Sequence, residues 1–339
     1  MDFEKAKRRQ TLKVILAESI MVMSVVALVA VLVSIVSGYW INADFEVERS
    51  GLLQVSSVPT GAIITVDDST WFQRTNTSKM VASTEHTVTV SKDGYDTWTK
   101  DIKVAEGLLY RLHYPRLFLK ERVKEVVWPT LNPTKTVVSP KHDVMLVYQA
   151  DGWSKINLNA DTPELKPLTS LEATNLMKDW ENLVKETEEY DENGNILLKF
   201  YEDQYVVIIK QDLITVRRKD TNEIVMSEKL PFVPAKTKIG HAGEFVVMSE
   251  GNNIATLVME TAEVVNWSVE SENFGWLDND MIYVTGDDGA LTVYDYDGLN
   301  RREIAAGVSS KWPVMITADK WLYYFNENNT LMREWLIPH

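Results

Sequence analysis

The chain has 339 residues, of which 45% are hydrophobic and 25% are charged, and its formal net charge is −14. This composition excludes a chain that is disordered throughout, and the length is enough for roughly two or three domains. The acidic balance disfavours nucleic acid as a partner, and the absence of cysteine excludes disulfides, a thiolate nucleophile and thiolate metal sites.

The first predicted element is an apolar helix near the N-terminus. Residues 20–41 carry no charge, and a helix of that length spans about 33 Å, which matches the hydrocarbon core of a membrane. A cleaved signal peptide, the alternative, would have a shorter apolar core of about 7–15 residues. We therefore expect a tail over residues 1–13 and an uncleaved transmembrane signal-anchor helix over residues 14–41.

Basic residues determine the expected orientation of this helix. They precede it at Lys5, Lys7, Arg8, Arg9 and Lys13, whereas acidic residues follow it. The positive-inside rule then leaves the N-terminus in the cytoplasm. The sequence predicts a single-pass protein of the cell membrane with the bulk of the chain extracytoplasmic.

Small residues recur along one side of the predicted membrane helix. Ala27, Ala30, Ser34 and Gly38 are spaced by three or four residues, a pattern that lets two membrane helices approach closely. This spacing gives a hypothesis of homodimerisation through the helix. The alternative is that small residues are simply common in membrane anchors.

A small all-β domain is predicted over residues 42–120. After a turn, Ala62, Ile64 and Val66 alternate with more polar neighbours, as expected for a half-buried strand. A second run places Val88 and Val90 on one face, and an Asp-Gly pair at residues 93–94 predicts a hairpin turn after it.

These strands carry a resemblance to a known family. The sequence Pro59-Thr60-Gly61-Ala62, followed by IITVDD, then EHTVTVSKDGYDTW with Gly94 and Tyr95, then IKVAEG, resembles the PEGA domain of bacterial and archaeal envelope proteins. In this chain Thr60 stands where the family usually has Glu. The resemblance implies a small β-sandwich that serves outside the cytoplasm as an interaction or spacer module, without catalytic residues.

The turn at residues 59–62 also has a direct physical interpretation. Proline fixes its own φ and biases Val58 toward an extended conformation, and Gly61 tolerates a positive φ. Ala62 is small enough to pack at a crowded sheet corner. We expect these residues to be structural, since turn chemistry accounts for them without a ligand.

Trp71 and Phe72 form the candidate contact surface of this domain. They lie in the expected polar hairpin and not on an alternating core face, and aromatic side chains are common at binding surfaces. The alternative is that they pack against other parts of the protein.

Residues 121–339 contain a repeat. Four-residue apolar cores begin at Met145, Tyr205, Phe245, Met281 and Trp321, which are 60, 40, 36 and 40 residues apart. A period near 40 is typical of β-propellers, and the pattern resembles divergent TolB-like or WD-type propellers. We expect a mostly β, propeller-like domain of about five blades, with a large β-sandwich as the alternative.

One segment interrupts this period. Apolar residues in residues 170–187 have helical spacing and predict a helix inserted between blades. A pair of short strands is the alternative.

Sequence motifs give no catalytic, cofactor-binding or metal-binding residues. We find no nucleophile elbow, phosphate loop or zinc-binding helix motif. Residues 191–195 and 295–300 resemble parts of calcium loops but lack the full set of oxygen ligands, so a hairpin turn is favoured for each.

The sequence therefore predicts a non-catalytic, membrane-anchored envelope protein that binds a protein or glycan partner. Two alternatives stay open. One is a membrane-tethered propeller hydrolase acting on glycans, since paired carboxylates are a spatial and not a sequential feature. The other is a structural subunit of a membrane assembly.

Overall fold

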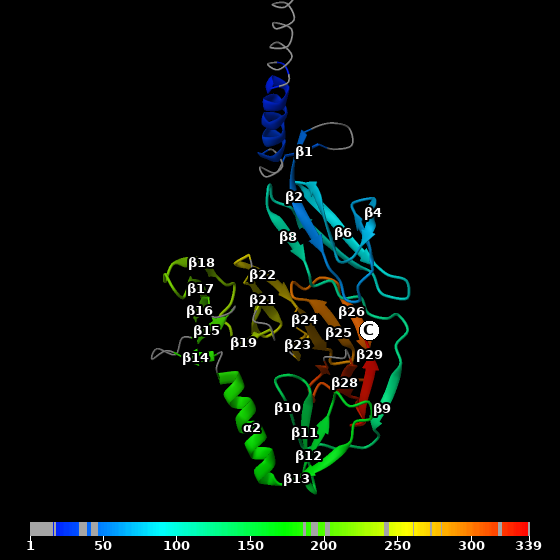
Figure 1. Ribbon diagram of the computed structural model, residues 1–339. Helices are drawn as coiled ribbons and strands as arrows, with labels where there is room; N and C mark the ends of the chain where they lie inside the picture. Colours follow the sequence, from blue (N-terminus) through cyan, green and yellow to red (C-terminus); the bar gives the residue numbers. More distant parts are fainter. Residues whose placement is uncertain are drawn as a thin grey trace, which may run out of the picture. The chain divides into compact units, whose positions relative to one another are not determined.

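The computed structural model describes residues 16, 18–33, 39–41, 47–185, 188–190, 196–200, 204–240, 244–259, 261–271, 273–278, 280–317 and 321–337 (Figure 1). The chain divides into two compact units, Met1–Leu117 and Phe118–His339.

The first unit begins with a helix over residues 18–33. Its large apolar side chains are exposed along its length, from Ile20 at 57% to Val33 at 58%. Within the described residues, no helix combines the length and the apolar character needed to cross a membrane. The expected helix over residues 14–41 was wrong at its end, because Tyr39–Ile41 form β1, which pairs with β2. Residues 34–38 lie outside the described residues.

Two four-stranded sheets make up the rest of the first unit. One has the order β4-β3-β6-β7, and the other has β1-β2-β5 with β8 parallel to β2. The strands are β1 (Tyr39–Ile41), β2 (Val47–Val55), β3 (Ile63–Val66), β4 (Ser69–Arg74), β5 (Thr77–Ala82), β6 (Glu85–Ser91), β7 (Trp98–Lys103) and β8 (Leu109–Leu112).

Buried and more exposed side chains alternate along these strands, and the buried ones form the core of the first unit. Ala62 and Ile64 are fully buried, and Val66 is nearly so, which confirms the predicted face of β3. Val88 and Val90 of β6 are also fully buried. The hairpin predicted after β6 joins it to β7, and the small β-sandwich expected from the sequence is the observed arrangement.

The described strands of the second unit form five antiparallel sheets. We number them sheets 1 to 5 in chain order. Sheet 1 contains β10 (Lys135–Val138), β11 (Val144–Gln149), β12 (Gly152–Asn157) and β13 (Leu165–Leu168). Sheet 2 contains β14 (Glu188–Tyr190), β15 (Ile196–Phe200), β16 (Tyr205–Lys210), β17 (Leu213–Arg218) and β18 (Ile224–Lys229).

Sheets 3 to 5 follow the same order of neighbouring strands. Sheet 3 contains β19 (Lys236–Ile239), β20 (Phe245–Glu250), β21 (Asn253–Val258) and β22 (Glu263–Ser268). Sheet 4 contains β23 (Phe274–Asp278), β24 (Met281–Thr285), β25 (Leu291–Asp295) and β26 (Arg302–Ala305). Sheet 5 contains β27 (Met315–Ile316), β28 (Trp321–Phe325), β29 (Leu331–Trp335) and β9 (Lys124–Trp128).

The five apolar cores predicted from the repeat lie on equivalent strands. Each lies on the second of the repeating strands in its sheet, in β11, β16, β20, β24 and β28; β14 is an additional strand before those of sheet 2. Consecutive meanders of about four strands are the unit of a β-propeller. The second unit is therefore propeller-like, and the strand pairing differs from that of one large β-sandwich.

Neighbouring sheets share apolar cores. One core joins side chains of sheets 2 and 3, including Val207 and Met248. Another joins sheets 1 and 5, including Met145 and Tyr323. The first strand of the unit, β9, pairs with β29 in the last sheet, so the two ends of the unit are held in one sheet.

A helix, α2 (Ser170–Lys185), lies in the chain between sheets 1 and 2 (green in Figure 1). It covers most of the range expected for an inserted helix. Thr169 and Glu172 form a capping box at its start, because the Glu172 carboxylate accepts hydrogen bonds from the Thr169 amide (2.8 Å) and hydroxyl (2.7 Å). These bonds lower the pKa of Glu172.

Candidate functional site

The predicted turn at residues 59–62 is held by hydrogen bonds to Thr75, which follows β4. The amides of Gly61 and Ala62 donate to the backbone and side-chain oxygens of Thr75, both at 2.9 Å. Gly61 has a φ of +77°, a conformation that glycine adopts readily. The turn is satisfied within the domain, in agreement with a structural role.

Lys92 joins this turn to the other part of the predicted motif. Its ammonium donates to the Thr60 carbonyl (2.8 Å) and lies 5.6 Å from the centre of the Tyr95 ring. Gly94, with a φ of +80°, forms the turn that places Tyr95 there. The structure therefore brings both turns of the motif together at one corner of the sandwich.

The candidate contact pair Trp71 and Phe72 is divided between two faces of β4. Trp71 is buried, with 5% of its surface exposed, and Lys79 lies 5.5 Å above its ring. Phe72 is 96% exposed. Successive strand residues point to opposite faces, so the expectation of a paired contact surface was wrong for Trp71, and only Phe72 is available on the surface.

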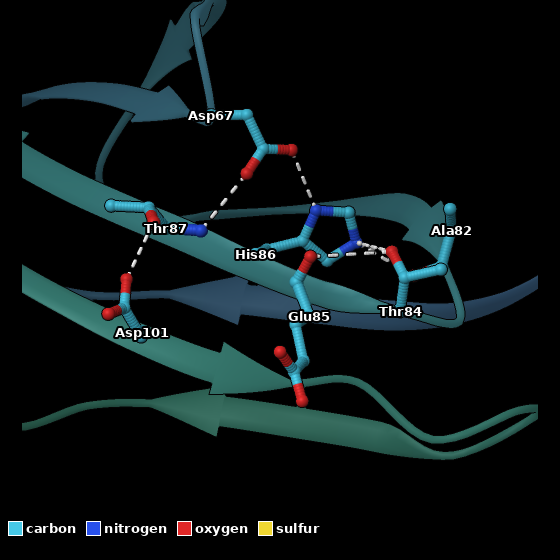
Figure 2. A network of polar contacts seen from close by, with 7 residues as sticks. All are labelled: Asp67, Ala82, Thr84, Glu85, His86, Thr87 and Asp101. Carbon is cyan, nitrogen blue, oxygen red and sulfur yellow. Dashed lines mark hydrogen bonds and ion pairs between the residues drawn. The ribbon is translucent and has the colours of Figure 1, made fainter.

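A polar network that the sequence did not reveal surrounds His86 of β6 (Figure 2). The ring is buried, with Nδ1 2.9 Å from the Asp67 carboxylate and Nε2 2.8 Å from the Ala82 carbonyl. Both ring nitrogens thus have hydrogen-bond partners within the domain. Because Ala82 ends β5 of the other sheet, His86 ties the two sheets together.

Asp67 completes this network at the turn between β3 and β4. Its second carboxylate oxygen accepts the Thr87 amide at 3.0 Å. The hydrogen bond from His86 is the main cause that lowers the pKa of Asp67 below its ordinary value of 3.8. Burial acts in the opposite direction, and the hydrogen bond from the Thr87 amide lowers the pKa further. His86 and Asp67 thus act as a structural pair that fixes β6 against the turn after β3.

The lowered pKa of Asp67 gives a pH-dependent contribution to stability. Such a carboxylate stabilises the fold above its unfolded pKa and loses that effect as pH falls through the folded pKa. We expect Asp67→Asn to destabilise the protein by less than about 1 kcal/mol near pH 7, because the side chain is half exposed and screened by water. The difference from wild type should shrink as pH falls below the ordinary pKa of 3.8 and be lost as pH passes through the lower folded pKa.

Urea unfolding of the full chain in detergent between pH 2 and pH 7 measures this difference. Asp68→Asn, which removes the same charge from the neighbouring residue, serves as the control. A difference for Asp67→Asn that stays constant over the whole range would contradict the assignment.

Two pairs of charged residues join the closing strand β9 to β29. Glu125 accepts a hydrogen bond from Arg333 at 2.6 Å. The fully buried Glu334 lies 3.0 Å from Lys124 and accepts the Tyr324 hydroxyl at 2.6 Å. These carboxylates are engaged in internal pairs, which favours a structural over a catalytic role for them.

Of the predicted helix-packing residues, Ala27 and Ala30 lie in the helix over residues 18–33. Ser34 and Gly38 lie outside the described residues, as does the segment 191–195. Dimerisation through the helix stays a prediction.

The segment 295–300 forms a tight turn after β25. The Gly298 amide donates to the Asp295 carbonyl (3.0 Å), and the Asn300 side chain donates to the Asp295 carboxylate (2.9 Å). In the part of the chain that the structure describes, no cluster of three or more His, Asp or Glu side chains could hold a metal ion.

Comparison with known proteins identifies the first unit and gives weak similarity for the second. No functionally curated protein matches the chain. The C-terminal WD40 domain of Sif2 is 11% identical with a TM-score of 0.30, covering 63% of this chain and 60% of that domain. Tricorn protease is 14% identical with a TM-score of 0.30, covering 71% of this chain and 23% of that one.

The family model of the PEGA domain matches residues 50–115, and this range contains both turns joined by Lys92 and the network around His86. The β-sandwich of the first unit is a PEGA domain.

Proposed function

We propose that the protein is a non-catalytic, membrane-anchored protein of the cell envelope whose extracytoplasmic β-domains bind a protein or glycan partner. The observation that carries this proposal is the helix over residues 18–33, whose large apolar side chains are exposed on all sides. A helix that is apolar all round belongs inside a large protein or a membrane.

The cost of exposing apolar side chains to water favours a membrane as the environment of this helix. Each exposed apolar side chain of this helix costs about 1.5–3 kcal/mol in water compared with an apolar environment. Side chains from Ile20 to Val33 are more than half exposed on average. The uncharged sequence continues from Ile20 to Gly38, before β1 begins at Tyr39, and a stretch of about 20 residues is long enough to span a bilayer.

The non-catalytic part of the proposal is supported by the internal pairing of two carboxylates in the described residues. The buried carboxylate Glu334 and the half-exposed Asp67 are both engaged in internal pairs, and a PEGA domain supplies no catalytic residues. The large acidic surface expected from a net charge of −14 keeps the extracytoplasmic part soluble.

Charges introduced into the helix test the anchoring. Leu28→Arg combined with Val31→Arg should move the protein from the membrane pellet to the soluble fraction after an alkaline wash, because each arginine near the bilayer centre costs about 2.5–3.5 kcal/mol. The variant with alanine at both positions is the control and should stay in the pellet. Wild-type protein found in the soluble fraction would refute anchoring.

Orientation is tested with introduced thiols, since the chain has no cysteine. Ser69→Cys should react with a membrane-impermeant maleimide on intact cells, whereas Lys5→Cys should react only after lysis. Labelling of Lys5→Cys on intact cells would place the N-terminus outside and contradict the proposed topology.

A further inference from the structure

One face of sheet 1 carries two aromatic side chains beside lysines. Lys135 of β10, Tyr148 of β11 and Trp153 of β12 are cross-strand partners, so they lie side by side on that face. The ring centroids of Tyr148 and Trp153 are 5.0 Å apart, and Lys135 Nζ lies 6.0 Å from the Trp153 ring. In the next row, Lys155 pairs with Lys166.

This face is less covered than its counterparts in the later sheets. The second and third strands of sheets 3, 4 and 5 are buried over most of their residues on both faces. In sheet 1 the opposite face packs in the core shared with sheet 5. On the aromatic face, Tyr148 is 41% exposed, and Trp153 and Lys155 are half-buried.

The chain order gives a reason for this difference. In a propeller each sheet packs against the next, but after sheet 1 the chain enters α2 and not a strand of sheet 2. Sheet 2 likewise has a half-buried face, since only alternate residues of β16 are fully buried. Helix α2 itself contacts β12, and Leu146, on the same face as Tyr148, is fully buried. The open part of the aromatic face is therefore limited to the end at Tyr148, which is 41% exposed.

We propose that this face binds an acidic carbohydrate, with a pyranose ring stacked on Tyr148 and its anionic groups paired with Lys135 and Lys155. The Tyr148 and Trp153 rings are tilted by 50° to each other, so Trp153 contacts the sugar from the side. The proposal rests on the proposed function and specifies the class of its ligand. Within the described residues, neither lysine forms a side-chain ion pair. In a chain with a net charge of −14, such a group of cations attracts an anion.

The backbone of the sheet favours a carbohydrate over a peptide. β11 and β12 pair on both sides with neighbouring strands, so a peptide cannot add to them as a further strand. Recognition at Tyr148 and Trp153 must therefore use their side chains, although β10 lies at an edge of the sheet. Aromatic rings offer flat apolar surfaces with a polar edge, which suits the C–H face of a sugar, and the lysines select an acidic one.

Titration of hexagalacturonate into the detergent-solubilised full chain, followed by tryptophan fluorescence, tests the site. Maltohexaose is the neutral sugar control and hexaglutamate the acidic peptide control. We expect hexagalacturonate to bind, and maltohexaose and hexaglutamate to bind at least about tenfold more weakly. Tyr148→Ala should weaken hexagalacturonate binding about tenfold, in line with the loss of a stacking contact.

Matched variants separate the site from general effects. Lys135→Gln should weaken binding about threefold and reduce its dependence on salt, because it removes one ionic contact. Lys210→Gln, which changes an exposed lysine of sheet 2, should bind as wild type does. Trp153→Ala provides a second test of stacking should Tyr148→Ala unfold.

Each other outcome overturns the proposal in a distinct way. Binding that is unchanged in Tyr148→Ala and Trp153→Ala refutes this face as the site. Tighter binding of hexaglutamate refutes the carbohydrate class while leaving a protein partner, and absence of binding to any of the three probes refutes the acidic-ligand site. None of these results alters the membrane fractionation and labelling that test the proposed function.

Discussion

Replacing Glu334 by alanine is expected to destabilise the second unit by about 3–5 kcal/mol, the usual cost of removing one partner from a buried ion pair. Glu334 is fully buried, 3.0 Å from the ammonium of Lys124 and 3.5 Å from Arg122. Its loss leaves two cations and the Tyr324 hydroxyl without their acceptor. Because Lys124 belongs to β9 and Glu334 to β29, the substitution weakens the pairing of these two strands, which closes the unit.

Urea unfolding of the full chain in detergent measures this loss, with Glu263→Ala at an exposed site of β22 as the control. Removing both members of the pair tests the mechanism. Lys124→Met combined with Glu334→Met should cost less than the sum of the two single changes, because no unpaired charge from the pair is left behind. A change of less than about 0.5 kcal/mol for Glu334→Ala would show that closure does not depend on this pair.

Hydrogen exchange should locate the same effect in the chain. In Glu334→Ala, the amides of β9 are expected to lose protection before those of β20 or β24, because the closing strand is paired on one side only. Equal loss of protection in all sheets would indicate global unfolding instead.

The repeat of apolar cores explains why much of the second unit was predictable. In sheets 3 to 5 these cores lie on strands that are buried on both faces, so they appear in the sequence as short continuous apolar runs. Phe245 and Met281 begin strands that are almost completely buried. The spacing of the runs then reflects the number of strands in each sheet.

Contacts between distant parts of the chain were not predictable in this way. The register that sets Glu125 opposite Arg333 joins residues about 200 positions apart, and no local pattern encodes it. His86 in β6 and Asp67 in the turn after β3 are 19 residues apart, and each looks like an ordinary surface residue in the sequence. The partly open face of sheet 1 likewise depends on which elements pack against it, and residues far along the chain decide that.

Trp71 illustrates a different limit of the sequence. It lies next to Phe72 in a segment of otherwise polar residues, where no alternation of apolar residues identifies the inward face. In a strand only one of two neighbours can point into the core. The structure assigns this position to Trp71, which is 5% exposed, and leaves Phe72 96% exposed.

The two aromatic residues are therefore expected to respond oppositely to truncation. Trp71→Ala should destabilise the PEGA domain by about 3–5 kcal/mol, because it leaves a large cavity in the sandwich. Phe72→Ala should change stability by less than about 0.5 kcal/mol. Hydrogen exchange of β3 and β4 in the full chain measures both, since amides of these strands should lose protection only in Trp71→Ala.

The comparison also tests the register of β4. A shift of the strand by one residue would move Phe72 into the core and Trp71 to the surface, and the two variants would then exchange their effects. Equal effects would mean that β4 samples both registers. A large loss for Trp71→Ala alone requires the observed register, in which the hydrogen bonds of Thr75 to Gly61 and Ala62 fix the end of β4 against the PEGA turn. That turn is then needed for the core of the domain, because it determines which aromatic ring enters it.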